Sequence, residues 1–137
     1  MLRLTSSLAI SFGSLLVIGC GGPVLYKLES TAKAPGADAT IVADIKKSES
    51  RTDLEITVTN LAPPERVCAG QTFVAWQKAG DRAWSRISSL AYDKEVRKSE
   101  TRMTVPEVQF DLQVTCEKLP TPVNPSTEII LAQTISK

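Results

Sequence analysis

The feature that most constrains the fold of this chain is a strict alternation of apolar and polar residues. The longest alternating run covers residues 108–117, and shorter ones cover 39–45 and 54–58. A period of two places successive side chains on opposite faces of an extended strand. These runs therefore predict half-buried antiparallel strands, because an amphipathic helix would repeat its apolar positions every three or four residues.

Turn-forming segments separate further strands, which we expect at 72–78, 84–92, 103–105 and 128–135. The segment 84–92 also fits a helix, but we favour a strand because a hairpin turn precedes it. The proline-rich run 119–125 fits neither regular structure, and the charged run 93–102 is expected to be a solvated sheet edge. About seven short strands in roughly 100 residues predict an all-β fold, an antiparallel two-sheet sandwich of the immunoglobulin or fibronectin type.

Residues 1–19 are expected to form an export signal. Arg3 is the only charged residue among them, and an apolar run follows at 8–18. This run is shorter than the roughly 20 residues that a membrane-spanning helix needs. A retained membrane anchor and a helix in the folded core are therefore the weaker alternatives.

The residues Val17-Ile18-Gly19-Cys20 resemble the lipobox of bacterial lipoproteins. The resemblance implies that the Cys20 thiol receives a diacylglyceryl group with palmitate-type chains, and that the signal is cleaved before Cys20. The new amine is often acylated too, and two or three acyl chains hold a protein stably on a membrane. In that family an aspartate after the cysteine tends to retain the protein on the inner membrane. Gly21 occupies this position, so in a cell with two membranes we expect the outer one, facing the periplasm or the surface.

The expected organisation is a signal peptide at 1–19, the lipidated Cys20 with a flexible tether over 20–37, and a β-sandwich domain over 38–137. A flexible tether of this length would reach on the order of 20–25 Å. Its apolar patch Val24-Leu25-Tyr26 could dock on the domain or lie at the lipid surface, and the residues alone leave both open.

With Cys20 lipidated, Cys68 and Cys116 remain as a pair in an oxidising compartment. Cys68 precedes the third expected strand and Cys116 lies near the end of the sixth. These strands are antiparallel neighbours in an immunoglobulin-like sandwich, so a disulfide is accessible. It would close a loop of about 48 residues and stabilise the fold by roughly 4 kcal/mol. The alternative to a disulfide is two buried free thiols. A metal or redox site is disfavoured, because two isolated cysteines without histidine make an incomplete site.

The two tryptophans, Trp76 and Trp84, flank a turn at Gly80. One interpretation is an exposed aromatic pair, a candidate binding surface for a glycan or a peptide. The favoured interpretation is structural, with Trp76 filling the core of its strand and Trp84 packing across the hairpin.

Charge and composition narrow the classes of function. The chain has 16 basic and 15 acidic residues, so removal of the segment that contains Arg3 leaves equal numbers of each. It also lacks a long basic block, so its charge gives no reason to expect nucleic-acid binding. Histidine is absent, which removes the commonest general base and metal ligand. No nucleophile-elbow or phosphate-binding motif occurs, and Asp111 and Glu117 are expected on a solvated strand face. We therefore expect no enzyme, no cofactor and no metal site.

The segments "TFVAWQKAG" and "QFDLQVTCE", a proline-rich loop and "EIILAQTI" follow one another in the sequence. Over residues 38–135 they are similar to the extracytoplasmic domain of anti-sigma-K-type regulators and to small envelope lipoproteins that share its sandwich. The matching residues are Phe73, Val74, Trp76, Phe110, Val114, Thr115 and Glu117. Cys116 is an addition to the pattern, and we expect neither sigma-binding helices nor a spanning helix before the domain.

These observations predict a membrane-anchored envelope lipoprotein that acts as a non-catalytic binding or structural module. Its expected partners are membrane lipid, through acylated Cys20, and an unidentified envelope protein or glycan. The alternative is an accessory sensor or regulator of envelope stress, which the resemblance to anti-sigma domains implies.

Overall fold

The structure is a computed structural model that describes residues 22–137, so the expected signal peptide and Cys20 lie outside the described residues. Within that range a helix α1 (Pro64–Val67) and a 3-10 turn η2 (Lys47–Glu49) accompany nine strands. In chain order the strands are β1 (Val24–Glu29), β2 (Asp38–Lys46), β3 (Arg51–Thr59), β4 (Thr72–Lys78), β5 (Ser85–Ser89), β6 (Tyr92–Asp93), β7 (Lys98–Val105), β8 (Phe110–Glu117) and β9 (Ile129–Ile135).

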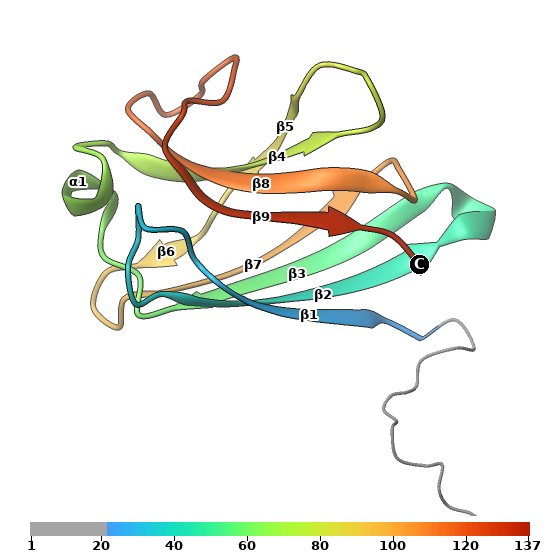
Figure 1. Cartoon of the computed structure of the whole chain (residues 1–137), viewed down its shortest axis with the longest axis horizontal. Helices are drawn as coiled ribbons and strands as arrows, with labels where there is room; N and C mark the ends of the chain where they lie inside the picture. The colour runs from blue at the N-terminus through green and yellow to red at the C-terminus, as the bar shows by residue number, and fades with distance from the viewer. Residues whose placement is uncertain (1–21) are drawn as a thin grey trace, which may run out of the picture.

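The strands form two antiparallel sheets packed face to face (Figure 1). Sheet A has the order β1-β2-β3-β7-β6, and sheet B has the order β5-β4-β8-β9. Without β1, sheet A has the A-B-E-D order of an immunoglobulin sandwich, and sheet B has the order C′-C-F-G. The predicted two-sheet sandwich is therefore confirmed, and β1 and β6, at the two edges of sheet A, are strands beyond the seven expected.

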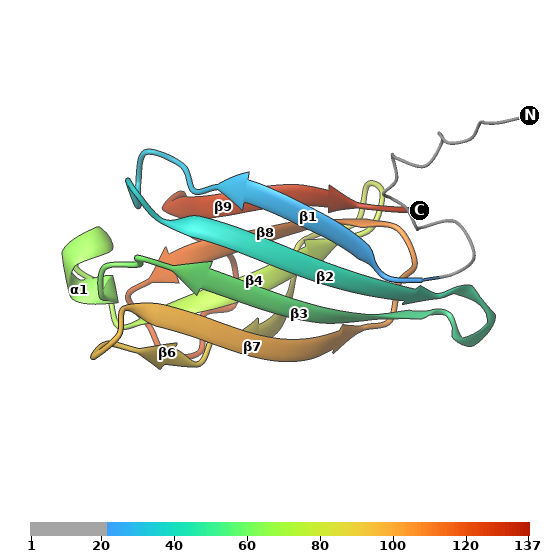
Figure 2. The ribbon, with the colours of Figure 1, turned by 90° about the horizontal axis from the view of Figure 1, so that it is seen from below.

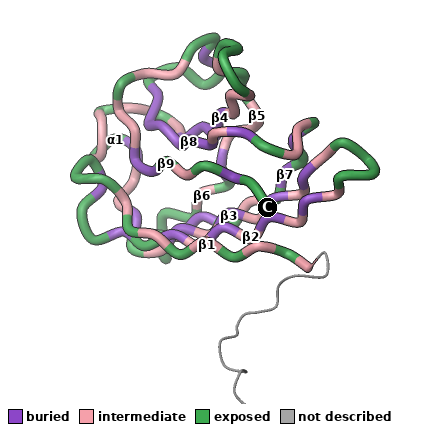
Figure 3. The backbone as a smooth tube through the Cα atoms, turned by 45° about the vertical axis from the view of Figure 1, so that its right-hand side comes forward, coloured by how far each residue is buried: buried purple, intermediate pink, exposed green. Residues whose placement is uncertain are grey.

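The core lies between the sheets and is built from the alternating runs. Ile41 of β2, Ile56 of β3 and Val114 of β8 are fully buried, and they belong to one continuous apolar cluster. Figure 3 shows buried residues along the strands and exposed ones mainly in the connections. The strict alternation was a reliable signal because every second residue of these strands faces the opposite sheet.

The register of the strands defines two ends of the sandwich. Val24 pairs with Ala43, Thr52 with Val105, and Phe110 with Ile135. The connections 47–50, 79–84 and 106–109 and the residues after β9 therefore lie at one end, which we call the hairpin end. The connections 30–37, 60–71, 94–97 and 118–128 lie at the other, which we call the loop end (Figures 1 and 2).

The prediction of a flexible tether up to residue 37 is wrong for residues 24–37. Residues 24–29 form β1, and Val24, Tyr26 and Leu28 pack against the core while the residues between them face outward. The following turn is held because the Thr31 backbone N–H donates to the Ile130 carbonyl of β9 at 2.8 Å. The domain therefore begins by residue 24 rather than at 38, since the patch 24–26 docks on the sandwich.

The two ambiguous stretches resolve into a strand and a hairpin. Residues 85–89 form β5, so the favoured strand over 84–92 is confirmed in its central part. The charged run 93–102 contains the β6–β7 hairpin instead of being an edge alone. Because β6 spans only Tyr92–Asp93, the part of β7 from Glu100 onward pairs with β3 alone, and this side of sheet A is the solvated edge that the charges predict.

Candidate functional site

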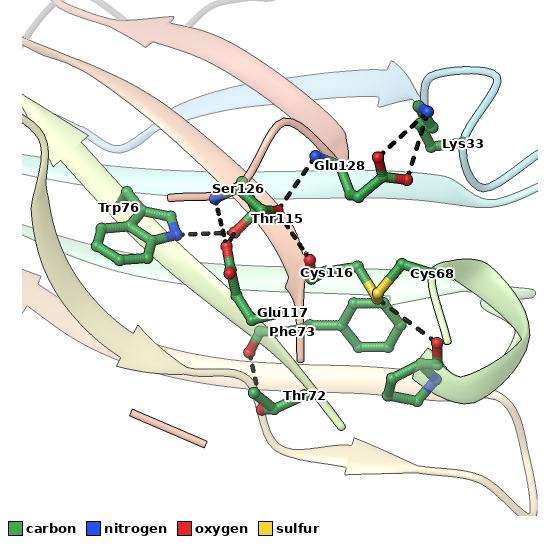
Figure 4. The surroundings of a disulfide bond; sticks show 11 residues. Lys33, Cys68, Thr72, Phe73, Trp76, Thr115, Cys116, Glu117, Ser126 and Glu128 are labelled. Atoms are coloured by element: carbon green, nitrogen blue, oxygen red, sulfur yellow. Dashed lines mark hydrogen bonds and ion pairs between the residues drawn. A yellow bond between two sulfur atoms is a disulfide. The ribbon is translucent and has the colours of Figure 1, made fainter. Parts of the chain in front are cut away.

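A disulfide-distance cysteine pair holds the loop end together. Cys68 follows α1, and Cys116 lies on β8 directly opposite Phe73 of β4. The two Sγ atoms are 2.14 Å apart and the Cα atoms 6.1 Å apart (Figure 4). The pairing predicted from strand order is present, and it ties the connection between the sheets to the centre of sheet B.

Gly70 is placed where no other residue fits. A Cβ atom at this position would lie 2.5 Å from Cys68 Sγ and 2.5 Å from the Glu117 carbonyl oxygen. Its own N–H donates to the Pro64 carbonyl at 3.1 Å, and the next N–H, that of Gln71, donates to the Glu117 carbonyl at 2.8 Å. The chain therefore passes so close to β8 and to the sulfur pair that it needs a residue without a side chain.

A buried hydrogen-bonded network lies on the outer face of sheet B (Figure 4). The Trp76 indole Nε1–H donates to Thr115 Oγ1 at 2.8 Å, and the Thr115 hydroxyl donates to the Glu117 carboxylate. The Ser126 backbone N–H donates to Glu117 Oε2 at 2.8 Å, and the Ser126 hydroxyl donates to the Cys116 carbonyl at 2.9 Å. We call Trp76, Thr115, Glu117 and Ser126 the Glu117 network.

The prediction that Glu117 lies on a solvated face is wrong, because the residue is only 5% exposed. Asp111, on the same face of β8 at the hairpin end, is half-buried and accepts a hydrogen bond from Thr134 Oγ1 at 2.9 Å. The difference arises from the β8–β9 loop, 118–128, whose Ser126 binds Glu117. A buried carboxylate needs such donors, since burial without them is costly.

The Glu117 network pins the β8–β9 loop to sheet B at its base. An ion pair between Lys33 and Glu128, with 3.3 Å between Nζ and Oε1, adds a contact from the β1–β2 turn. Pro122 is buried, while Leu119 and Val123 are 64% and 84% exposed. The loop therefore holds two apolar side chains in solvent at the loop end.

The two tryptophans do not form a joint binding surface. Trp76 has no exposed area and belongs to the Glu117 network, so its assignment to an exposed aromatic pair is wrong. It lies on the outer face of sheet B and not in the cluster between the sheets, which differs from the core position expected. Trp84 is half-buried at the hairpin end, with Lys78 Nζ 5.9 Å from its ring centroid, a cation–π contact across the β4–β5 hairpin.

Tyr92 forms the other feature of the loop end. Its ring packs edge-on against Phe73, with 5.5 Å between ring centroids, and its hydroxyl donates to the Leu61 carbonyl. Burial raises the pKa of the Tyr92 phenol, because the charged phenolate is less well solvated there. A shallow hollow beside it is lined by Pro63, Glu65, Thr72 and Lys94, among others.

Sequence reasoning missed the Glu117 network and Tyr92. A polar residue on the alternate face of a strand gives the same pattern whether that face meets water or a covering loop.

Over residues 22–137 no cluster of three metal-ligating side chains is present. In the same range no helix is long and apolar enough to cross a membrane.

Comparisons with known proteins leave the family of this chain open. No family model matches the chain, and neither curated proteins nor solved structures give a significant match. The resemblance to lipoproteins and to anti-sigma extracytoplasmic domains therefore stays a prediction from the residues that carry it.

Proposed function

We propose that this chain is a membrane-anchored envelope lipoprotein, and that its sandwich is a non-catalytic module that contacts another envelope protein through the loop end. The anchor is Cys20, acylated after removal of residues 1–19. The observation that carries the contact role is the exposure of Leu119 and Val123 on a loop whose base is fixed by the Glu117 network.

Fixing a loop before binding favours association. A mobile loop would lose conformational freedom on binding, whereas a loop that is already ordered avoids most of that cost. Leu119 and Val123 offer apolar area without needing an induced rearrangement. The polar side chains of Thr115, Glu117 and Ser126, which a catalytic site would need free, already have hydrogen-bond partners: Thr115 donates to Glu117, and the Ser126 hydroxyl donates to the Cys116 carbonyl. This supports a binding role over an enzymatic one.

The experiment is site-specific photocrosslinking in intact cells of the source organism. A photoreactive amino acid is placed at Val123, on the loop, and in a matched control at Thr57, on the outer face of sheet A. We expect one discrete crosslinked protein from position 123 and none from 57. A Cys20→Ser variant, which lacks the acceptor thiol, should lose the membrane association and the crosslink together. Equal, diffuse crosslinking from both positions contradicts the contact role.

A further inference from the structure

The edge strand β1 determines where the chain enters the sandwich. In the immunoglobulin strand order the first strand is β2, whose start at Asp38 lies at the loop end. The added strand runs antiparallel to β2, with Val24 opposite Ala43 and Glu29 opposite Asp38. The chain therefore enters at the hairpin end, opposite the loops.

The connection between Cys20 and β1 is too short for Cys20 to reach the loop end. Four peptide units join Cys20 to Val24, and each spans at most about 3.8 Å, which gives about 15 Å in total. The nine residues of β2 extend over about 30 Å. The Gly22 carbonyl also accepts a hydrogen bond from Lys137 Nζ at 3.0 Å, which ties the entry point to the residues after β9. A lipid on Cys20 can reach the hairpin end but not the loop end.

The chemistry of the hairpin end suits a lipid headgroup layer without requiring anionic lipid. Leu25 is 55% exposed, and it lies across from Val42 on the outer face of sheet A. Lys46 contacts Asp44 at 3.2 Å, and Arg51 forms ion pairs with Glu49 and Asp53. With Lys47 included, the β2–β3 hairpin carries as many basic as acidic residues. Little net charge remains for electrostatic attraction to a membrane.

We infer that the surface of the bilayer that carries the anchor is the partner of the hairpin end, and that the pairing of β1 with β2, together with the short connection after Cys20, points the loop end away from the lipid. The inference rests on the proposed acylation of Cys20. It adds an orientation to that proposal. The short connection from Cys20 to β1 keeps the hairpin end at the membrane, and Leu119 and Val123 then face the aqueous space.

The test uses the full lipidated protein in phosphatidylcholine vesicles that contain a headgroup-attached, contact-range quencher. An azide-bearing amino acid at exposed Ser48, on the hairpin end, or at Val123, on the loop end, carries the fluorophore, so the cysteines stay unchanged. We expect a large loss of fluorescence at position 48 and none at position 123. Ten Gly and Ser residues inserted after Gly21 are the matched control, and they should remove most of the difference.

The outcomes separate the orientation from the acylation. Intact mass of the same sample reports the acyl groups, and an unmodified Cys20 overturns the proposed function itself. An acylated protein with equal quenching at positions 48 and 123 overturns the orientation alone. Quenching at position 48 that appears only after addition of phosphatidylglycerol also overturns the inference, because electrostatic attraction would then orient the domain in place of the short connection.

Discussion

Removal of the Cys68–Cys116 bridge has a predictable cost. The bridge closes a 48-residue separation in the chain, and the chain-entropy model assigns about 4 kcal/mol to a loop of that length. The double variant Cys68→Ala/Cys116→Ala should therefore lose about 4 kcal/mol of its free energy of unfolding, which is nearly a thousandfold in the folding constant. For a domain of this size the melting temperature should fall by about 12–20 °C.

The assay is guanidinium unfolding of residues 22–137, followed by tryptophan fluorescence, for the wild type with and without reductant and for the double variant. Trp76 is a suitable reporter because it is fully buried beside the strand that carries Cys116. We expect the reduced wild type and the double variant to unfold at similar, much lower denaturant concentrations. Identical midpoints for the oxidised and reduced wild type would refute the reasoning.

Three further predictions concern the loop end. Gly70→Ala should destabilise the fold by about 1–3 kcal/mol, typical of an overpacked site, because its Cβ would collide with Cys68 Sγ and the Glu117 carbonyl; thermal unfolding measures this, and an unchanged melting temperature contradicts it. Thr115→Val should cost about 1–3 kcal/mol by leaving Trp76 Nε1–H without a partner and removing one of the hydrogen bonds to Glu117, and should speed hydrogen exchange at Ser126, whereas Thr115→Ser should keep most of the stability. Burial raises the pKa of Tyr92 in the folded state, so its contribution to the free energy of unfolding is present below the ordinary phenol pKa and is lost as the pH rises through the raised value; ultraviolet titration should show a late-ionising phenol, and Tyr92→Phe should remove it.

The alternating runs made the sandwich predictable because a period of two leaves few arrangements for the apolar face. Ile41, Ile56 and Val114 all lie where this pattern places them. The cysteine pairing was predictable for the same reason, since the strand order of a sandwich brings the start of β4 beside the end of β8. The sandwich and the cysteine pairing both depend only on regular strands, whose geometry is the same from one protein to the next.

The edge strand and the candidate site were harder to predict from sequence. Residues 24–29 read "VLYKLE", in which Leu25 interrupts the alternation, and the glycines and prolines around them are typical of a tether. Their pairing with β2 depends on a free sheet edge that no local pattern reveals. The alternation of its strand predicts a solvated Glu117, and this prediction fails because the burial of Glu117 comes from Ser126, nine residues later.

The most direct test of this account is the intact mass of the native protein purified from its membrane. We predict a polypeptide that begins at Cys20, carries a diacylglyceryl group with or without a further acyl chain, and is two hydrogens lighter than its reduced form because of the Cys68–Cys116 bridge. A soluble, unacylated polypeptide that still contains residues 1–19 would contradict the account.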